Sequence, residues 1–135
     1  MNIESKKIAI NKEAKVIYDF VGNFNNFQKL LPSQVEGWTS TVDTCSFKVG
    51  GFMQIQLRMV EKIPYSKVVV APDSSTAPQL PFQLIVSMNE KNGVTDTVVS
   101  TSIEGNSMML MMVKGKIKPA LDSLAEQLKY FVENM

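Results

Sequence analysis

The chain has 135 residues, of which 44% are hydrophobic and 20% are charged, and its formal net charge at neutral pH is +1. This length suits one domain with a single core, and the composition excludes a disordered or fibrous protein. The lysines are spread along the chain, and we interpret their closest cluster, Lys114, Lys116 and Lys118, as a solvated rim rather than a phosphate site. We therefore expect no nucleic-acid partner. We predict one domain at residues 1–135.

Two features of the composition restrict the chemistry. The sequence contains no histidine and a single cysteine, Cys45. Serine–histidine and cysteine–histidine nucleophiles and structural zinc sites are therefore excluded, and any catalysis would need Asp, Glu, Lys, Tyr or a reactive cofactor. Cys45 has no cationic neighbour in the sequence, so we interpret it as an inert packing residue. We expect neither a metal nor a cofactor.

The sequence also carries signals about the compartment. A lone cysteine cannot form an intramolecular disulfide, which fits a reducing environment. The first residues contain no apolar signal-peptide region, and no stretch approaches the roughly 20 apolar residues of a membrane span. We expect a cytoplasmic protein with no transmembrane segment.

The first quarter of the chain predicts a strand followed by two short helices. Residues 3–10 are compatible with a strand, and Asn11 has the character of a helix N-cap. Lys12, Glu13 and Ala14 are expected to form the first turn of the first helix, which ends at Gly22. Apolar residues at helical spacing predict a second helix over residues 24–31, which Pro32 ends.

The hydrophobic period then changes to two, which predicts strands. Six are expected, at residues 34–41, 44–49, 53–59, 67–71, 82–88 and 97–103. In the third of them, Met53, Ile55, Leu57 and Met59 alternate with polar residues and define an inward face. The proline-rich stretch 72–81 is expected to be a loop, and Asn92-Gly93 is a strong hairpin turn.

The last element is a long helix. Its apolar stripe is formed by Ile117, Leu121, Leu124, Leu128 and Phe131, at helical spacing over about five turns. Pro119 is expected near the first turn, where its missing N–H costs little. The order of elements predicts an α+β fold, in which an antiparallel curved sheet of about seven strands wraps around the C-terminal helix.

This order resembles the helix-grip fold of the START and pollen-allergen-like superfamily, which includes polyketide cyclases, aromatases and ubiquinone-binding proteins. The resemblance covers essentially the whole chain. Its supporting stretches are Val21 to Phe27 with Leu31-Pro32, Val60 to Lys67, and Met108 to Val113 before the final helix. It implies a ligand cavity between the sheet and the long helix, open near the short helices.

We predict a binding or carrier protein for a small hydrophobic molecule, such as a lipid, an isoprenoid or an aromatic polyketide-like compound. The predicted lining residues are Phe27, Leu31, Trp38, Met53, Ile55, Leu57, Phe82, Leu84, Val99, Thr101, Met108, Met112, Leu121 and Leu124. Most of them, taken singly, are better explained by core packing, whereas Trp38 fits ligand stacking and core packing equally well. Nine methionines strengthen the prediction, since flexible thioethers adapt to variable apolar shapes.

Two other functions stay open. One is a polyketide cyclase or dehydratase that uses carboxylate, tyrosine or arginine side chains for proton transfer, although no carboxylate pair is placed for this by spacing alone. No catalytic residue is therefore assigned, and the balance favours a protein that is not an enzyme. The other is an interaction module, including a homodimer, that uses the methionine-rich surface.

Overall fold

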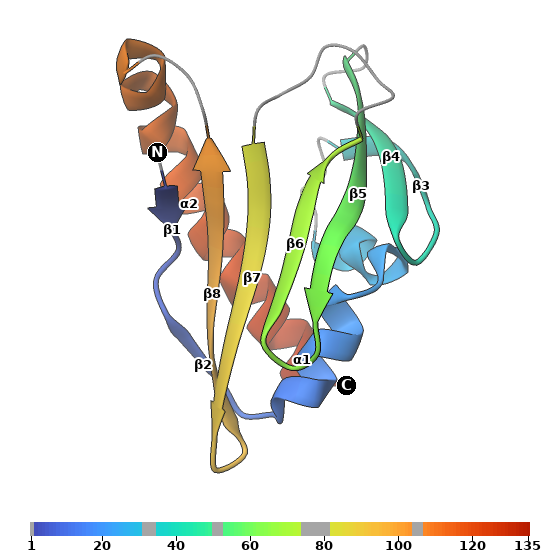
Figure 1. Ribbon diagram of the computed structural model, residues 1–135, viewed down its shortest axis with the longest axis vertical. Coiled ribbons are helices and arrows are strands. Elements are labelled where there is room, and N and C mark those ends of the chain that lie inside the picture. The colour runs from blue at the N-terminus through green and yellow to red at the C-terminus, as the bar shows by residue number, and fades with distance from the viewer. Residues whose placement is uncertain (1, 31–34, 50–52, 74–81, 104–106) are drawn as a thin grey trace.

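The computed structural model describes residues 2–30, 35–49, 53–73, 82–103 and 107–135 (Figure 1). Residues 35, 49, 53, 82, 103, 107–114 and 116 are described by their backbone alone. The elements in chain order are β1 (Asn2–Glu4), β2 (Ile8–Ile10), α1 (Ala14–Val21), the 3-10 helix η1 (Phe24–Leu30), β3 (Val35–Ser40), β4 (Thr44–Val49), β5 (Met53–Ile63), β6 (Lys67–Pro72), β7 (Phe82–Lys91), β8 (Val94–Ile103) and α2 (Ser107–Glu133).

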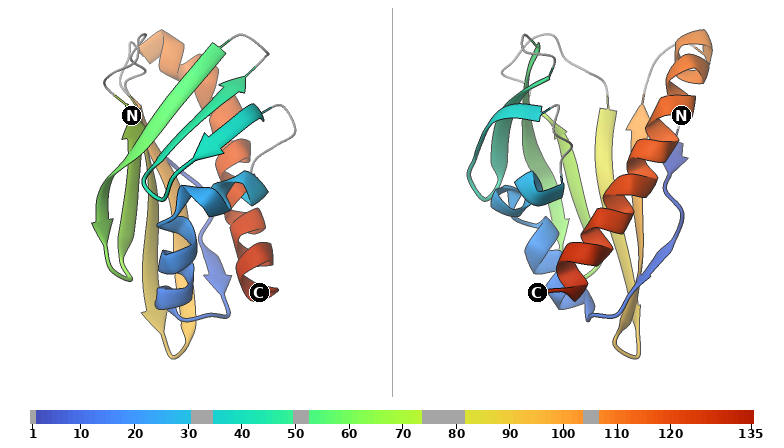
Figure 2. Two further views of the ribbon diagram at one scale, coloured as in Figure 1. Left: turned by 90° about the vertical axis from the view of Figure 1, so that its right-hand side faces the viewer. Right: turned by 180° about the vertical axis from the view of Figure 1, so that it is seen from behind.

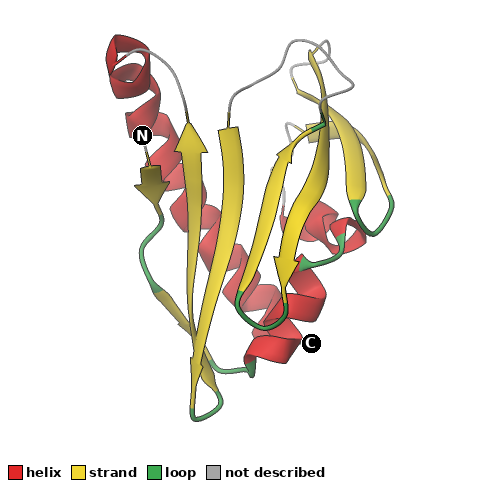
Figure 3. Ribbon diagram, viewed as in Figure 1, coloured by secondary structure: helices red, strands yellow, loops and turns green. Residues whose placement is uncertain are grey.

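All of these strands belong to one antiparallel sheet in the order β1-β8-β7-β6-β5-β4-β3, and β2 also pairs with β8. The long helix α2 crosses one face of the sheet diagonally (Figure 2, right). The short helices α1 and η1 lie on the same side of the sheet, beside the C-terminal end of α2 (Figure 3). The predicted α+β helix-grip arrangement, with a curved sheet and a long C-terminal helix, is confirmed.

The sheet has eight strands rather than about seven, because the expected strand at residues 3–10 is divided in two. Ile3 pairs with Thr101 and Ile8 pairs with Thr97. The N-terminal segment therefore advances five residues while β8 advances four, so it contains one extra residue. Ser5 fills the mismatch, since its hydroxyl oxygen accepts a hydrogen bond from the Val99 amide at 2.9 Å. A side chain thus replaces a backbone partner at this point of the sheet edge.

The start of α1 differs from the sequence prediction. The N-cap is Glu13 and not Asn11, and no side chain of the cap residue bonds to the helix. Instead, the Ala14 amide donates a hydrogen bond to Glu90 Oε1 of β7 at 2.7 Å. A carboxylate from a distant strand satisfies the free amide, which local sequence rules do not anticipate.

The helix α2 begins ten residues before Ile117, at Ser107, so Met108 to Val113 belong to the helix and do not precede it. Pro119 therefore lies inside the helix rather than in its first turn. Methionine, leucine and lysine are good helix formers, and this propensity prevails over the proline. Pro119 still removes the N–H that would bond to the Gly115 carbonyl, which leaves one gap in the ladder.

The core is formed by the inward faces of the strands together with one face of each helix. From α2 it takes Leu121, Ala125, Leu128 and Val132. On β8 the buried face carries three threonines whose hydroxyls donate to backbone carbonyls. Thr95 donates to Lys12 at 2.7 Å, Thr97 to Thr95 at 3.4 Å, and Thr101 to Gln83 at 2.8 Å. In the part of the chain that the structure describes, no buried side-chain nitrogen or oxygen lacks a partner.

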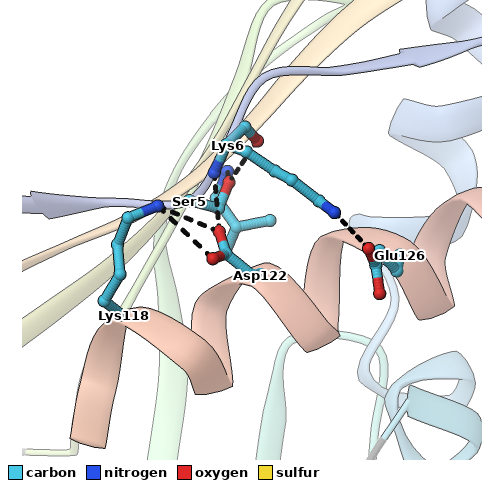
Figure 4. Close-up of polar contacts among 6 residues, drawn as sticks. Ser5, Lys6, Lys118, Asp122 and Glu126 are labelled. Carbon is cyan, nitrogen blue, oxygen red and sulfur yellow. Dashed lines mark hydrogen bonds and ion pairs between the residues drawn. The ribbon is translucent and has the colours of Figure 1, made fainter. Parts of the chain in front are cut away.

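A second face of α2 carries a polar stripe, which we define as Asp122, Glu126, Lys129 and Glu133. All four residues contact the segment that joins β1, β2 and α1. The Lys6 amide donates to Asp122 Oδ1 at 2.7 Å, and the Lys6 ammonium pairs with Glu126 (Figure 4). Further along, Lys129 Nζ donates to the Ala9 carbonyl at 2.7 Å, and the Asn11 amide donates to Glu133 Oε2 at 2.8 Å.

These contacts hold α2 against the edge of the sheet along about three turns. The apolar face of the helix and its polar stripe therefore act on two different neighbours, the sheet interior and the N-terminal segment. The position of α2 is defined from both sides.

Truncation of the apolar face of α2 tests the core. Leu128→Ala is expected to lower the free energy of unfolding by about 2–5 kcal/mol, because Leu128 is only 1% exposed and its loss leaves a cavity. The neighbouring Gln127 is exposed, so Gln127→Ala is the matched control and should stay within about 0.5 kcal/mol. Denaturant titration measures both. A loss below about 1 kcal/mol for Leu128→Ala would contradict the packing described.

The polar stripe has a pH signature. The Lys6 amide and the Lys118 ammonium hold the pKa of the Asp122 carboxyl below its usual value. The ionised carboxylate therefore stabilises the fold above about pH 4, and this stability is lost as the pH falls through the lowered pKa of the folded state. Asp122→Asn should lower the melting temperature at neutral pH, and its difference from the wild type should narrow below about pH 4.

Thermal melts of both proteins across the acid range measure this difference. Asp19→Asn is the control, since the Asp19 carboxylate lies 3.9 Å from Lys15 Nζ on the surface and should matter less at neutral pH. A melting-temperature difference for Asp122→Asn that stays constant down to about pH 2 would contradict the assignment.

Candidate functional site

An apolar cavity lies between the sheet, the short helices and α2, and its volume is about 90 Å³. It exposes no polar surface. The residues around it are Val21 of α1, Phe27 and Leu30 of η1, Trp38 of β3, Phe47 of β4, Leu57 of β5, Leu84 and Val86 of β7, Val99 of β8, and Leu124 and Leu128 of α2. Every layer of the fold contributes to this wall.

The strand residues reach the cavity through regular alternation. Leu84 pairs with Thr101 and Val86 pairs with Val99, so β7 and β8 present neighbouring side chains on the inner face. Phe47 of β4 pairs with Ile55 on the same face, and Leu57 follows on β5. Period-two alternation in four strands therefore builds one side of the cavity.

Three aromatic rings line the cavity beside η1, those of Phe27, Trp38 and Phe47, and the ring of Phe24 packs against two of them. Trp38 stacks on Phe47 with ring centroids 5.5 Å apart and an interplanar angle of 21°. Phe24 contacts Trp38 edge-on at 6.5 Å and Phe27 at 4.9 Å. The indole N–H of Trp38 donates to Ser40 Oγ at 3.1 Å. The sequence left two roles open for Trp38, ligand stacking or core packing, and its half-buried ring packs against the core while bordering the cavity.

Six of the fourteen predicted lining residues lie on the cavity wall: Phe27, Trp38, Leu57, Leu84, Val99 and Leu124. Three others pack elsewhere. Ile55 packs against the core beside the wall, Leu121 is buried one turn before Leu124, and the hydroxyl of Thr101 is used by the Gln83 carbonyl. Strand alternation and helical spacing predict the correct inward face for these three residues. They do not predict where along its strand or helix each residue lies relative to the cavity.

The other five predicted lining residues fall outside the description of side chains. Leu31 lies outside the described residues, and Met53, Phe82, Met108 and Met112 are described by backbone alone. The sequence also predicts that residues 24–31, 72–81 and 106–114 cluster at an opening of the cavity, and most of the last two segments lies outside the described side chains. Of these segments, η1 contributes Phe27 and Leu30 to the wall.

Five wall residues were missing from the predicted lining: Val21, Leu30, Phe47, Val86 and Leu128. The last two lie on faces that alternation or helical spacing already marked as inward, so the signal for them was present. Phe47 follows Cys45 by two residues and shares its buried face. Only the packing of α1 and η1 onto the sheet brings Val21 and Leu30 to the cavity.

No ionisable side chain borders the cavity among the described residues. Burial raises the pKa of the Cys45 thiol to about 12, so at neutral pH it is not a thiolate nucleophile. Among the described surface residues, Lys6 and Asp122 have shifted pKa values, because of the contacts between the N-terminal segment and the polar stripe. Among residues that the structure describes, no three Cys, Asp or Glu side chains come together as a metal site.

A second hollow is an open groove of about 330 Å³ on β3, β4 and β5. Its lining is rich in hydroxyls, including Thr39, Thr41 and Ser46, together with Gln56 and Asp73. Some of these groups already bond to neighbours, as Thr41 does to Thr44 at 2.7 Å. The groove differs from the cavity in that polar groups share its surface with apolar ones such as Leu57, and it is more open to solvent.

No protein-family model matches the chain, and no curated protein matches its sequence. Solved structures match its fold. A putative uncharacterized protein from Bacillus thuringiensis superposes with a TM-score of 0.71 at 11% identity, over 98% of each chain. The Aha1 dimer from Colwellia psychrerythraea gives a TM-score of 0.64 at 16% identity over 96% of each chain.

A third structure, protein MLL2253 from Mesorhizobium loti, gives a TM-score of 0.70 at 8% identity, over 100% of this chain and 98% of the other. At these identities the likeness shows the fold alone. Separately, none of the helices in the described ranges is long and apolar enough to span a membrane.

A cavity-filling substitution tests whether the volume is free. Val99→Ile adds one methylene group beside the cavity and is expected to raise the free energy of unfolding by up to about 0.8 kcal/mol. Val98→Ile is the matched control, because Val98 is half-buried on the opposite face of the same strand. Denaturant titration compares the two. A loss above about 1 kcal/mol for Val99→Ile would mean that the space is already filled.

Proposed function

We propose that this protein binds or carries a small hydrophobic molecule, whose apolar part occupies the cavity between the sheet and α2. The observation that carries the proposal is the cavity wall, which is formed by apolar residues and exposes no polar surface. Binding to such a wall is driven by the transfer of the ligand's hydrocarbon out of water. The wall provides no hydrogen bond to a polar group of the ligand. The resemblance to the START and pollen-allergen-like superfamily supports the same assignment.

The size of the side chains around the cavity is a second argument for a ligand. Side chains leave a volume of about 90 Å³ here, and apolar space that side chains do not fill generally lowers stability. Larger side chains at Val86 or Val99 would recover part of this stability. Small residues at these two positions are therefore consistent with space that is kept for a ligand.

The volume of the cavity limits the size of the ligand group that it can hold. A space of 90 Å³ corresponds to the liquid volume of about three water molecules, less than an engineered apolar cavity of about 150 Å³ that takes benzene. The cavity therefore suits a short stretch of hydrocarbon. We propose the apolar end of a longer molecule, such as an acyl or isoprenoid chain, with the polar end outside.

A cyclase or dehydratase is the alternative that a proton-transfer group in the cavity would favour. The described part of the wall offers no such group, and the hydroxyl of Thr101 is bonded to a carbonyl. An interaction module would instead need a filled core and a large apolar patch. The cavity favours the binding function over both.

Homodimerisation is compatible with ligand binding. The similar structure from Colwellia psychrerythraea is described as a dimer, and we propose that a second copy of this chain is its first candidate protein partner. Sedimentation velocity over a range of concentrations measures this directly, and a monomer throughout would reject it.

Ligand capture tests the proposed function. Protein purified without added ligand is expected to carry an apolar small molecule, visible by native mass spectrometry and recovered by organic extraction. After extraction, a fluorescent fatty-acid analogue should bind, and Val99→Ile should bind it more weakly than Val98→Ile. The proposal fails if the extracted protein binds no apolar probe, or if both variants bind the probe equally well.

A further inference from the structure

Trp38 differs from the other residues of the cavity wall in how it reaches the cavity. It lies on β3, which forms the last strand of the described sheet on that side, so β4 is its one strand neighbour there. Glu36 pairs with Lys48 and Thr39 pairs with Ser46, so three steps on β3 oppose two on β4. A β-bulge at Gly37 and Trp38 accounts for the extra residue.

The bulge turns the indole inward. In a regular ladder, Trp38 would share the face of Glu36, which is exposed, because residues two apart point the same way. Gly37 has a φ of +65°, a left-handed conformation that glycine adopts without strain. The register shift moves Trp38 to the inner face, where it stacks on Phe47.

One short chain of hydrogen bonds holds the indole in this position. Its N–H donates to Ser40 Oγ at 3.1 Å, and the Ser40 hydroxyl donates to Asn25 Oδ1 of η1 at 2.6 Å. The ring is half-buried, whereas the aromatic rings beside it, Phe24, Phe27 and Phe47, are buried. Trp38 is thus a wall residue that reaches both the cavity and the surface, and its indole is linked to η1 by hydrogen bonds through Ser40 and by a ring contact with Phe24.

We propose that Trp38 sets the size limit of the apolar ligand, and that the Ser40–Asn25 hydrogen bonds hold its indole closed over the cavity. This inference rests on the proposed binding function. With the indole stacked on Phe47, the cavity keeps its volume of about 90 Å³ and accepts a narrow hydrocarbon end. When the indole turns away, the space it leaves joins the cavity and a bulkier apolar group fits.

Competition between two probes measures the size limit. The probes are decanoic acid, which is narrow, and anilinonaphthalene sulfonate, which is bulky and fluoresces when bound. In Trp38→Phe, the affinity for the bulky probe relative to the narrow one should rise at least about tenfold, equivalent to about 1.4 kcal/mol. Phe27→Leu is the matched control, because it also removes volume from the wall but leaves the indole in place.

The hydrogen bonds are tested without any ligand. Trp38 is the single tryptophan of the chain, so its fluorescence reports on this site alone. Ser40→Ala should raise the quenching of this fluorescence by acrylamide, since the indole loses its partner. Ser46→Ala is the control, because Ser46 accepts a hydrogen bond from Gln54 Nε2 at 3.0 Å and lies away from the indole N–H. Circular dichroism establishes that the variants are folded.

The outcomes separate the two proposals. If the wild type binds probes but Trp38→Phe leaves their affinity ratio unchanged, or Phe27→Leu changes it equally, the size limit is overturned while the binding function stands. Unchanged quenching in Ser40→Ala overturns the role of the hydrogen bonds. If neither the wild type nor Trp38→Phe binds any probe, the binding function fails and the size limit with it.

Discussion

The burial of the apolar face of α2 against the inner face of the sheet is the interaction on which the other features depend. Leu121, Ala125, Leu128 and Val132 all leave water on this face. Among the strands, α2 lies closest to β8, β1 and β2, at one side of the sheet. A single helix is too narrow to cover a curved sheet of eight strands, so α1 and η1 complete the layer. The cavity lies where these three helices and the sheet meet.

The two sides of the cavity are held in different ways. On the α2 side, Leu124 and Leu128 belong to a helix that the core fixes from one face and the polar stripe from another. On the opposite side, Trp38 belongs to an edge strand. Within the described residues, its hairpin bonds to η1 through the Ser40–Asn25 pair and through the Phe24 amide, which donates to the Val42 carbonyl at 3.0 Å. Few bonds and an edge position are features of low local stability, so adaptation to a ligand is expected on the β3 and η1 side.

The fold was predictable because the strongest signals in the sequence are periodic. Alternation in the residues of β5, β7 and β8 and the apolar stripe of α2 identify the inward faces from the order of residues alone. What this reasoning missed depends on contacts between distant residues. The extra residue at Ser5, the Glu90 cap on α1 and the start of α2 at Ser107 each reflect a tertiary contact or a summed propensity that overrides a local rule.

At the candidate site, too, the residues predicted from periodicity differ from those placed by contacts between distant residues. Leu57, Leu84 and Val99 were predicted because parity alone places them inward, whereas Val21 and Leu30 reach the cavity only through the docking of α1 and η1. Trp38 is the informative case, because strict alternation with the exposed Glu36 would have turned it outward. Its inward position requires one extra residue in β3, and Gly37 with its positive φ supplies the necessary conformation. A local irregularity in an edge strand therefore places the largest side chain of the wall at the cavity, which links the shape of the site to an irregular part of the sheet.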